Sequence, residues 1–325
     1  MGLTYSRADS LSPPPLPSFA DLTAATAKSI KESAKAEKIN YLDLPAPIKY
    51  EDIQRETLMA LKPEVFEGMR FEINKPLNQN FFLSHSLFMG NMELGTGGRQ
   101  ILKAPIGTYE FGANVISEKF MMLGRIATDG RLSGRLKYDL LDWLAVKLHM
   151  QLSNEAGQSQ VMVDSDVKGH DWNAQVKLGS PSFIGLNYFQ SITPKLSAGG
   201  EFFWLQSNLK SGVGFAMRHT GDKHVANLQV ATTGIMSMGY AHKVSEKITL
   251  ASDFLWHWQS REATATVGFD CMLRQCRLRG KIDSNGVVST YVEERFAPGI
   301  NFVLSAEIDH PHSNHRFGFG VVAGE

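Results

Sequence analysis

The chain has 325 residues, with 33 basic and 33 acidic side chains that give a formal net charge of zero. This balance produces no long-range field toward polyanions, so no nucleic-acid partner is expected. No run of 18 apolar residues occurs, which excludes a membrane-spanning helix but not a membrane barrel, because barrel strands alternate apolar and polar residues.

Residues 1–50 form an extension rich in Pro, Ala and Lys, and we expect it to be partly disordered. Its first residues, "MGLTYS", fit a myristoylation pattern at Gly2, but such a short match also arises by chance. Residues 51–66 follow as a second unit. There "EDIQRETLMAL" (51–61) predicts a helix that ends before Pro63, joined by a linker to the rest of the chain.

From residue 67 to the end the hydrophobic period is two. In "RLSGRLKYDL", the apolar positions Leu132, Leu136 and Leu140 alternate with the charged positions Arg135 and Lys137. Similar runs of near ten residues, separated by turn signals such as "TDGR" and "SNG", recur about nineteen times up to residue 323. The pattern predicts an all-β antiparallel meander over 67–325.

Alternation by itself also fits a soluble β-sandwich, so strand length and side-chain placement must decide. About ten residues tilted near 45° rise about 24 Å, which matches the apolar band of a membrane barrel. Tryptophans stand near the ends of runs, at the level where a barrel meets the lipid–water boundary: Trp143, Trp172, Trp204, Trp256 and Trp258.

A sheet in lipid must pair every backbone group, so the last run should pair with the first. The final strand "HRFGFGVVAGE" therefore pairs with "EGMRFEINK". In an up-and-down meander of nineteen strands these two run in the same direction, and the closing pair is parallel. We expect a transmembrane 19-stranded barrel closed by a parallel pair.

Motifs for chemistry are missing from the sequence. It contains no G-x-S-x-G, P-loop or H-E-x-x-H pattern, and "GTGG" (95–98) lacks the context of a dinucleotide loop. The two cysteines, Cys271 and Cys276, do not suit a disulfide framework or a zinc site. We expect no catalytic residue, no cofactor and no metal.

Several segments together resemble one family. "YEDIQRETLMALKPEVFEGMRFEINKPLNQNFFLSHS", "YEFGANVI", "YFQSITPKLSAGGEFFW" and "RQCRLRGKIDSNG" are similar to the central barrel subunit of the translocase of the mitochondrial outer membrane, nearest to its plant and green-algal form within the mitochondrial porin superfamily. The resemblance runs from about Tyr41 to the C-terminus, and "QSITPKLSAGGE" separates it from the voltage-dependent anion channel.

The resemblance implies a nineteen-stranded barrel in the mitochondrial outer membrane with a helix inside the pore. It implies passage of unfolded precursor polypeptides that carry targeting sequences, and association with lipid, a second copy of the barrel, a receptor subunit and small single-helix subunits. The chain's end resembles the sorting signal of such barrels, with Arg316, Gly318, Val321 and Ala323 at the matching positions. Ala323 is a small version of the last position.

A channel for polypeptides needs a wet wall with weak, replaceable partners for both signs of charge. The polar faces of the runs provide these, and the acidic candidates for the pore lining are Asp171, Glu201, Asp253, Asp270, Asp283 and Glu307. The basic candidates are Arg125, Arg131, Arg135, Lys137, Lys147, Lys177, Arg277, Arg279 and Lys281.

Two alternatives stay open from the sequence. An anion- or metabolite-diffusion pore of the voltage-dependent anion channel type would have the same shape, but it gains from a strongly basic wall that this chain does not have. A soluble β-rich binding module would show the same alternation and would remain in the aqueous phase without detergent.

Overall fold

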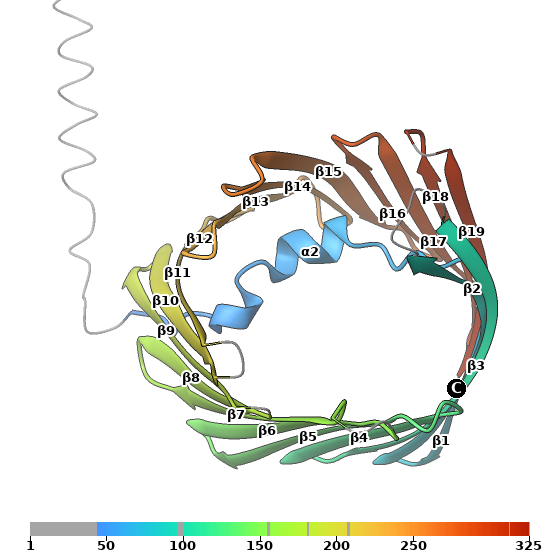
Figure 1. Ribbon diagram of the computed structural model, residues 1–325, viewed down its shortest axis with the longest axis horizontal. Coiled ribbons are helices and arrows are strands. Elements are labelled where there is room, and N and C mark those ends of the chain that lie inside the picture. The colour runs from blue at the N-terminus through green and yellow to red at the C-terminus, as the bar shows by residue number, and fades with distance from the viewer. Residues whose placement is uncertain are drawn as a thin grey trace, which may run out of the picture. The chain divides into compact units, whose positions relative to one another are not determined.

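The computed structural model describes residues 44–95, 101–154, 157–180, 182–206, 209–311 and 313–324. The expected extension up to residue 43, including Gly2, lies outside the described residues. From Asp43 onward the chain is one compact unit, and its strands form the closed ring seen in Figure 1. The predicted fold class, a barrel of 19 strands with a helix inside, is confirmed.

A short 3-10 helix and an α-helix precede the strands, and their bounds are η1 Tyr50–Asp52 and α2 Arg55–Leu61. The strands are β1 Gly68–Asn78, β2 Phe81–Gly95, β3 Ile101–Ile116, β4 Phe120–Ala127, β5 Leu132–Leu141, β6 Leu144–Leu152, β7 Gln160–Lys168, β8 Trp172–Gly179, β9 Phe183–Thr193, β10 Leu196–Leu205, β11 Lys210–Thr220, β12 His224–Ala231, β13 Ile235–Lys243, β14 Ile248–His257, β15 Glu262–Met272, β16 Cys276–Asp283, β17 Val287–Ala297, β18 Ile300–Asp309 and β19 Asn314–Gly324.

Barrel closure is made by the two terminal strands. Each strand pairs antiparallel with its neighbour in the chain, while β1 and β19 pair in parallel from Gly68↔Gly318 to Asn74↔Gly324. The parallel closing pair predicted from the odd strand number is therefore confirmed. It leaves the sheet without a free edge, as lipid requires.

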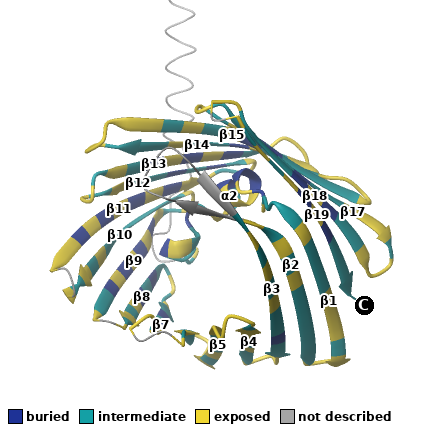
Figure 2. Ribbon diagram, turned by 45° about the vertical axis from the view of Figure 1, so that its right-hand side comes forward, coloured by how far each residue is buried: buried dark blue, intermediate teal, exposed yellow. Residues whose placement is uncertain are grey.

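The outer face of the ring is apolar and solvent-accessible. Phe215 is 66% exposed, Phe317 62%, Val267 61% and Ile282 60%, and all four alternate along their strands with residues that face the interior. Figure 2 shows this alternation of exposed and less exposed positions along the strands. An apolar skin of this extent on a β-barrel is matched to lipid rather than to water.

The five tryptophans stand at strand ends, as the sequence predicts. Trp172 opens β8, Trp204 and Trp256 are the next-to-last residues of β10 and β14, and Trp143 and Trp258 lie in turns. Trp256 and Trp258 lie with ring centroids 5.4 Å apart. No helix in the described ranges is long and apolar enough to span a bilayer.

The predicted helix over 51–61 is divided into η1 and α2. The break falls at Ile53 and Gln54, where the Ile53 carbonyl accepts a hydrogen bond of 2.8 Å from Arg218 Nη1 of the wall. The barrel thus takes over an acceptor that a continuous helix would use internally. Figure 1 shows α2 within the ring of strands.

Candidate functional site in the barrel interior

The inner face of the wall follows from the strand register. Residues directly opposite one another in neighbouring strands point to the same face. Lys147 contacts Glu51 of the inner segment, and its partner Asp164 and the next partner Lys177 therefore face inward too. When the pairing is followed around the sheet, every second residue of each strand faces inward. The assignments reached from the two directions agree where β1 pairs with β19.

The inner segment, residues 44–61, is fastened first by its backbone carbonyls. Ser191 Oγ donates to the Pro45 carbonyl at 2.7 Å, and Asn173 Nδ2 donates to the Pro47 carbonyl. Neither proline has an N–H to offer, so the wall meets only their acceptors. These contacts begin before residue 51, where the sequence placed the start of the pore-associated unit.

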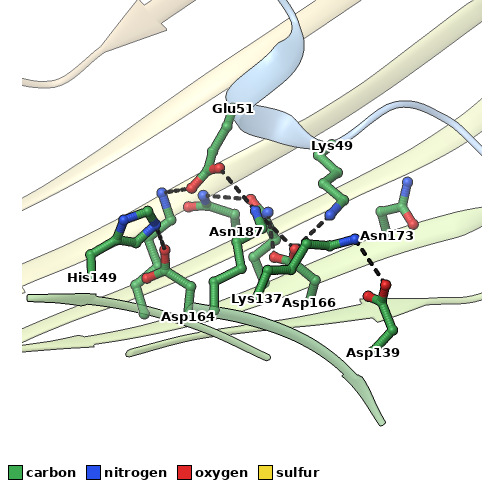
Figure 3. A network of polar contacts seen from close by, with 12 residues as sticks. Lys49, Glu51, Lys137, Asp139, His149, Asp164, Asp166, Asn173 and Asn187 are labelled. Carbon is green, nitrogen blue, oxygen red and sulfur yellow. Dashed lines mark hydrogen bonds and ion pairs between the residues drawn. The ribbon is translucent and has the colours of Figure 1, made fainter. Parts of the chain in front are cut away.

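Charged side chains form the next attachment, drawn in Figure 3. Lys49 Nζ lies 2.5 Å from Asp166 Oδ2, and Lys147 Nζ lies 3.0 Å from the same oxygen. Glu51 then bridges Lys147, at 3.7 Å, and Lys177. The five groups alternate in sign, so each buried or half-buried charge meets an opposite one.

Glu51 carries an altered acidity. Burial alone would raise the pKa of its carboxyl, but the hydrogen bond from Lys177 and the charges of Lys177 and Lys147 outweigh burial and hold this pKa below its usual value. The carboxylate form is therefore the one that the wall binds.

A second ion pair fastens α2. Arg218 donates to both oxygens of Glu56, with Nη1–Oε2 at 2.8 Å and Nη2–Oε1 at 2.6 Å. Burial acts to raise the Glu56 pKa, but hydrogen bonding to Arg218 and to backbone prevails, and the pKa lies below its usual value. Arg218 is 5% exposed and depends on Glu56 and the Ile53 carbonyl for its hydrogen bonds inward.

Apolar contacts fill the space between these pairs. Tyr50 packs edge-on against Phe189, with ring centroids 6.3 Å apart, and Ile53 is fully buried beside them. Further on, Ala60 and Leu61 pack on the inner-facing Ala241 and Ala251. Gly268 leaves room for Leu61, because a Cβ there would lie 2.8 Å from its Cδ2.

The linker to β1 is held at the closing seam. Phe66 donates its N–H to Ser305 Oγ at 3.3 Å, and that hydroxyl donates to the Phe66 carbonyl at 2.9 Å. A Cβ on Gly318 would lie 2.3 Å from the Phe66 carbonyl oxygen, so only glycine permits this approach.

Most residues that the sequence assigned to the pore lining occupy inner positions of strands. These are Arg125, Arg135, Lys137, Lys147, Lys177, Glu201, Asp253, Asp270, Arg277, Arg279, Lys281, Asp283 and Glu307. Arg131 lies outside the strands, in the β4–β5 turn. Asp171 lies in the β7–β8 turn and accepts a 3.4 Å bond from Gln190, an outer-face residue.

Some of these residues meet one another. Asp270 accepts two hydrogen bonds from Arg277, at 2.7 and 3.1 Å, and Arg279 stacks on the Tyr291 ring at 5.4 Å. Glu307 lies 3.7 Å from Arg316, one of the residues of the predicted sorting signal. Val321 and Ala323 of that signal face outward on β19, opposite Phe71 and Ile73 of β1.

Several residues that hold the inner segment were not predicted from the sequence: Asp166, Asn173, Ser191 and Arg218. Gln175 and Asn187 were not predicted either, and they support Asp166 from the wall through a chain of hydrogen bonds. The run "VMVDSDVK" alternates in the same way as "RLSGRLKYDL", and this alternation marks Asp164 and Asp166 as residues of the polar face.

Around Arg218 the signal is Ala216, a small inner residue of β11 that packs with Tyr50 and Ile53. Gly212 and Gly214 of the same strand give room to Phe203 and Glu201 of β10. Small inward residues on a barrel wall indicate that something packs there.

Comparison with known proteins assigns the fold to a family. The model of the eukaryotic porin family matches residues 46–318. The chain belongs to the eukaryotic porin family. The probable mitochondrial import receptor subunit TOM40-2 of Arabidopsis thaliana is 51% identical over 289 residues, which cover 88% of this chain and 93% of that protein. This confirms the resemblance to the plant form of the import translocase barrel.

More distant eukaryotic porins carry the same designation. The mitochondrial import receptor subunit TOM40 homolog of Xenopus laevis is 25% identical over 86% of this chain and 85% of its own length, and the human homolog is 25% identical over 86% and 79%. Among solved structures, a variant of the Rh. blastica porin covers 75% of this chain and 96% of its own, at 12% identity and a TM-score of 0.48. That likeness is too low to support an argument.

Proposed function

We propose that this eukaryotic porin is the protein-conducting channel of the mitochondrial outer membrane, through which unfolded precursor polypeptides enter mitochondria. The identity of 51% to a TOM40 subunit over nearly the whole of both chains is the observation that carries the assignment. The closed barrel with an apolar outer face supplies the membrane-spanning wall that such a channel requires.

The proposed mechanism uses the mixed charge of the inner wall. A chain in transit keeps its backbone hydrated and exchanges one weak partner for the next, so no single contact holds it. Targeting segments are rich in Arg and poor in acids. We assign the transient binding of these segments to the inner carboxylates Glu201, Asp253 and Asp270. At physiological salt the attraction is screened beyond about 8 Å, so each carboxylate acts only on the nearby part of the passing chain.

The inner segment shapes the path. Residues 44–61 contact strands from β6 to β16 and so occupy part of the interior. This segment is held by ion pairs and small apolar contacts, and it narrows the pore without blocking it. Precursors then pass between this segment and the opposite wall.

The partners belong to the same proposal. The relatives are named as receptor subunits, so the channel works inside an import complex. We propose that it associates there with a second barrel, with a receptor subunit and with small single-helix subunits, and that Arg316, Gly318, Val321 and Ala323 direct its insertion. The relatives from Arabidopsis thaliana, Xenopus laevis and human are named as import subunits, and none of these three supports the diffusion-pore alternative.

Peptide binding to the reconstituted channel tests the proposal. The triple variant Glu201→Gln, Asp253→Asn, Asp270→Asn should raise the half-blocking concentration of a cationic amphipathic peptide about tenfold, because each partly exposed ion pair contributes a factor of a few. Asp270 takes part by exchanging Arg277 for the cation of the peptide. A control that neutralises three turn carboxylates, Glu118, Asp129 and Glu246, removes the same charge elsewhere. Equal block in both variants would contradict the assigned carboxylates, and clear anion preference under a salt gradient would favour the diffusion pore.

A further inference from the structure

Among the described residues, the inner wall contains cations that form no ion pair with a carboxylate. Most inner basic groups have carboxylate partners: Lys147 and Lys177 pair with Glu51, Arg218 pairs with Glu56 and Arg277 with Asp270. Arg125 of β4 and Arg135 of β5 differ from these. Within the described part of the chain, no carboxylate oxygen lies within 4.0 Å, the limit for an ion pair, of a guanidinium nitrogen of either arginine.

These two arginines are neighbours on one patch of wall. Arg125 stands opposite Ser133, and Arg135 follows on the same face of β5, so the two guanidinium groups are diagonal neighbours. Lys137 continues the row, opposite Lys147 and paired at 2.9 Å with Asp139. Arg125 and Arg135 are exposed, and we call them, with Lys137, the basic strip.

A recess accompanies the strip. A hollow of about 240 Å³ is lined by five residues with hydrogen-bond donors, Arg125, Ser133, Arg135, His149 and Gln151, and by Leu123, Gly134 and Met150. Three carboxylates stand near its margins. Asp164 lies 3.8 Å from His149 Nε2. Glu110 and Glu72 share an adjoining hollow with Arg125 without forming an ion pair with it, and Glu72 pairs with Arg70. Among the described residues, the recess therefore presents two guanidinium groups that have no ion-pairing carboxylate.

The two arginines of the strip also lie beyond the contacts of the inner segment. Glu51 reaches Lys147 of β6, and Lys49 shares a hollow with Lys137. Among the described residues, no hydrogen bond or ion pair of the inner segment reaches either arginine. Helix α2 contacts β13–β16, and η1 contacts β9 and β10. Figure 1 shows β4 and β5 across the ring from α2. A polypeptide that passes between the inner segment and the open wall would therefore meet the basic strip.

We propose that the basic strip binds acidic segments of polypeptides in transit, through carboxylates received by Arg125 and Arg135. This inference rests on the proposed function and adds a second class of cargo segment to it. Guanidinium groups take carboxylates in a two-point geometry. Because both arginines are exposed to water, each contact is weak and exchangeable, which suits passage rather than retention.

Single-channel recording in planar bilayers tests the strip, with polyglutamate as the probe and a polylysine peptide of equal length for comparison. The double variant Arg125→Gln, Arg135→Gln should raise the half-blocking concentration of polyglutamate about tenfold. It should still show the unitary conductance of a folded barrel. The control Lys223→Gln with Lys247→Gln removes the same charge from two turns and should not change the half-blocking concentration. Raising the salt from 0.1 to 1 M should weaken polyglutamate block of the wild type as the screening length falls from about 10 to about 3 Å.

The outcomes separate the inference from the function on which it rests. If polylysine and a cationic amphipathic peptide still enter but polyglutamate block is identical in wild type and double variant, the strip proposal is overturned and the channel assignment stands. If no peptide enters the wild-type barrel, both are overturned. Inorganic triphosphate and polyglutamate are compared by their half-blocking concentrations, counted per negative charge. If triphosphate blocks the channel at the lower concentration, the strip binds small phosphate anions, and its assignment to peptide carboxylates is wrong.

Discussion

Glu56 of the inner helix and Arg218 of strand β11 form a two-point ion pair, with N–O distances of 2.6 and 2.8 Å. The same guanidinium group also donates to the Ile53 carbonyl, so one wall residue holds both the helix and the backbone just before it. The arginine is buried while the carboxylate is about one-third exposed. The position of α2 in the pore therefore depends on a cation that has few alternatives to these partners.

Loss of Arg218 should release α2. The variant Arg218→Gln removes the donor of Glu56 and leaves the Ile53 carbonyl with only the 3.5 Å bond from Asn227 Nδ2. We expect a cost of about 2–3 kcal/mol to docking, below the ~3–5 kcal/mol of a fully buried pair because Glu56 keeps contact with water. Hydrogen exchange of the amides in 55–61 should then accelerate at least about thirtyfold. Lys137→Gln removes the same charge far from α2 and should leave this exchange unchanged. Equal protection in both variants would show that the apolar contacts suffice.

Acid should undock the inner segment in a defined range. The pKa values of Glu51 and Glu56 are lowered by the wall, so these carboxylates stabilise docking fully above the ordinary glutamate value of about 4.3, and this contribution is lost as the pH falls through the lowered values. We expect no change from pH 8 to pH 5 and increasing mobility below about pH 4.

A spin label at the exposed Leu58 reports this transition, after Leu58→Cys with Cys271→Ala and Cys276→Ala. In the matched variant with Glu51→Gln and Glu56→Gln the wall loses its anionic partners, so the label should be mobile already at pH 7 and respond less to acid. A wild-type transition near pH 6 would point to another group and contradict this account.

The strands could be predicted from the sequence because their period of two directly reflects burial on one side. The run "RLSGRLKYDL" therefore became β5 with the expected faces. The attachment of the inner segment could not be predicted in this way. Glu51 meets Lys147 and Lys177 only because the registers of β6, β7 and β8 bring those two lysines together, and no local pattern encodes a register.

The division of the predicted helix follows from the same limit. The sequence of 51–61 favours a continuous helix, but Arg218 is more than 150 residues away and takes the Ile53 carbonyl. Tertiary contact overrides local propensity there. Conversely, the small inner residues Gly212 and Gly214 were a readable sign of close packing, since a Cβ at Gly212 would lie 2.4 Å from Phe203 and one at Gly214 would lie 2.8 Å from Glu201.

An added methyl group at Gly318 should disturb the closing seam. In Gly318→Ala the new Cβ would meet the Phe66 carbonyl oxygen at 2.3 Å and Ser305 Oγ at 2.5 Å, so the linker must move or β19 must shift against β1. We expect about 1–3 kcal/mol of destabilisation, seen as a lower unfolding temperature of the barrel in detergent. Gly107→Ala on β3 adds the same group where nothing lies within 4 Å and should have little effect.

This pair of variants also separates packing from targeting. If Gly318→Ala inserts poorly into mitochondria but, once refolded, unfolds at the wild-type temperature, the glycine acts in the sorting signal alone. A lowered unfolding temperature together with normal insertion would place its whole role in the seam.

Labelling of single cysteines along β5 and β6 tests the two-faced wall directly. A thiol in water ionises and reacts with a membrane-impermeant maleimide, whereas a thiol in hydrocarbon does not. In a background with Cys271→Ala and Cys276→Ala, cysteines at Ser133, Arg135, Lys147 and His149 should react at least about tenfold faster than their chain neighbours. The outer positions for comparison are Leu132, Leu136, Val146 and Leu148.

Leu209 in the β10–β11 turn is 82% exposed, and Leu209→Cys gives the rate for a thiol in open water. Inner positions should approach this rate, and outer positions should reach it only after the membrane is dissolved by detergent, because detergent exchange exposes the lipid-facing side intermittently. Equal rates at adjacent positions within one strand would mean that both faces meet the same solvent. A barrel with lipid outside and a wet interior would then be wrong for this chain, whatever its relatives do.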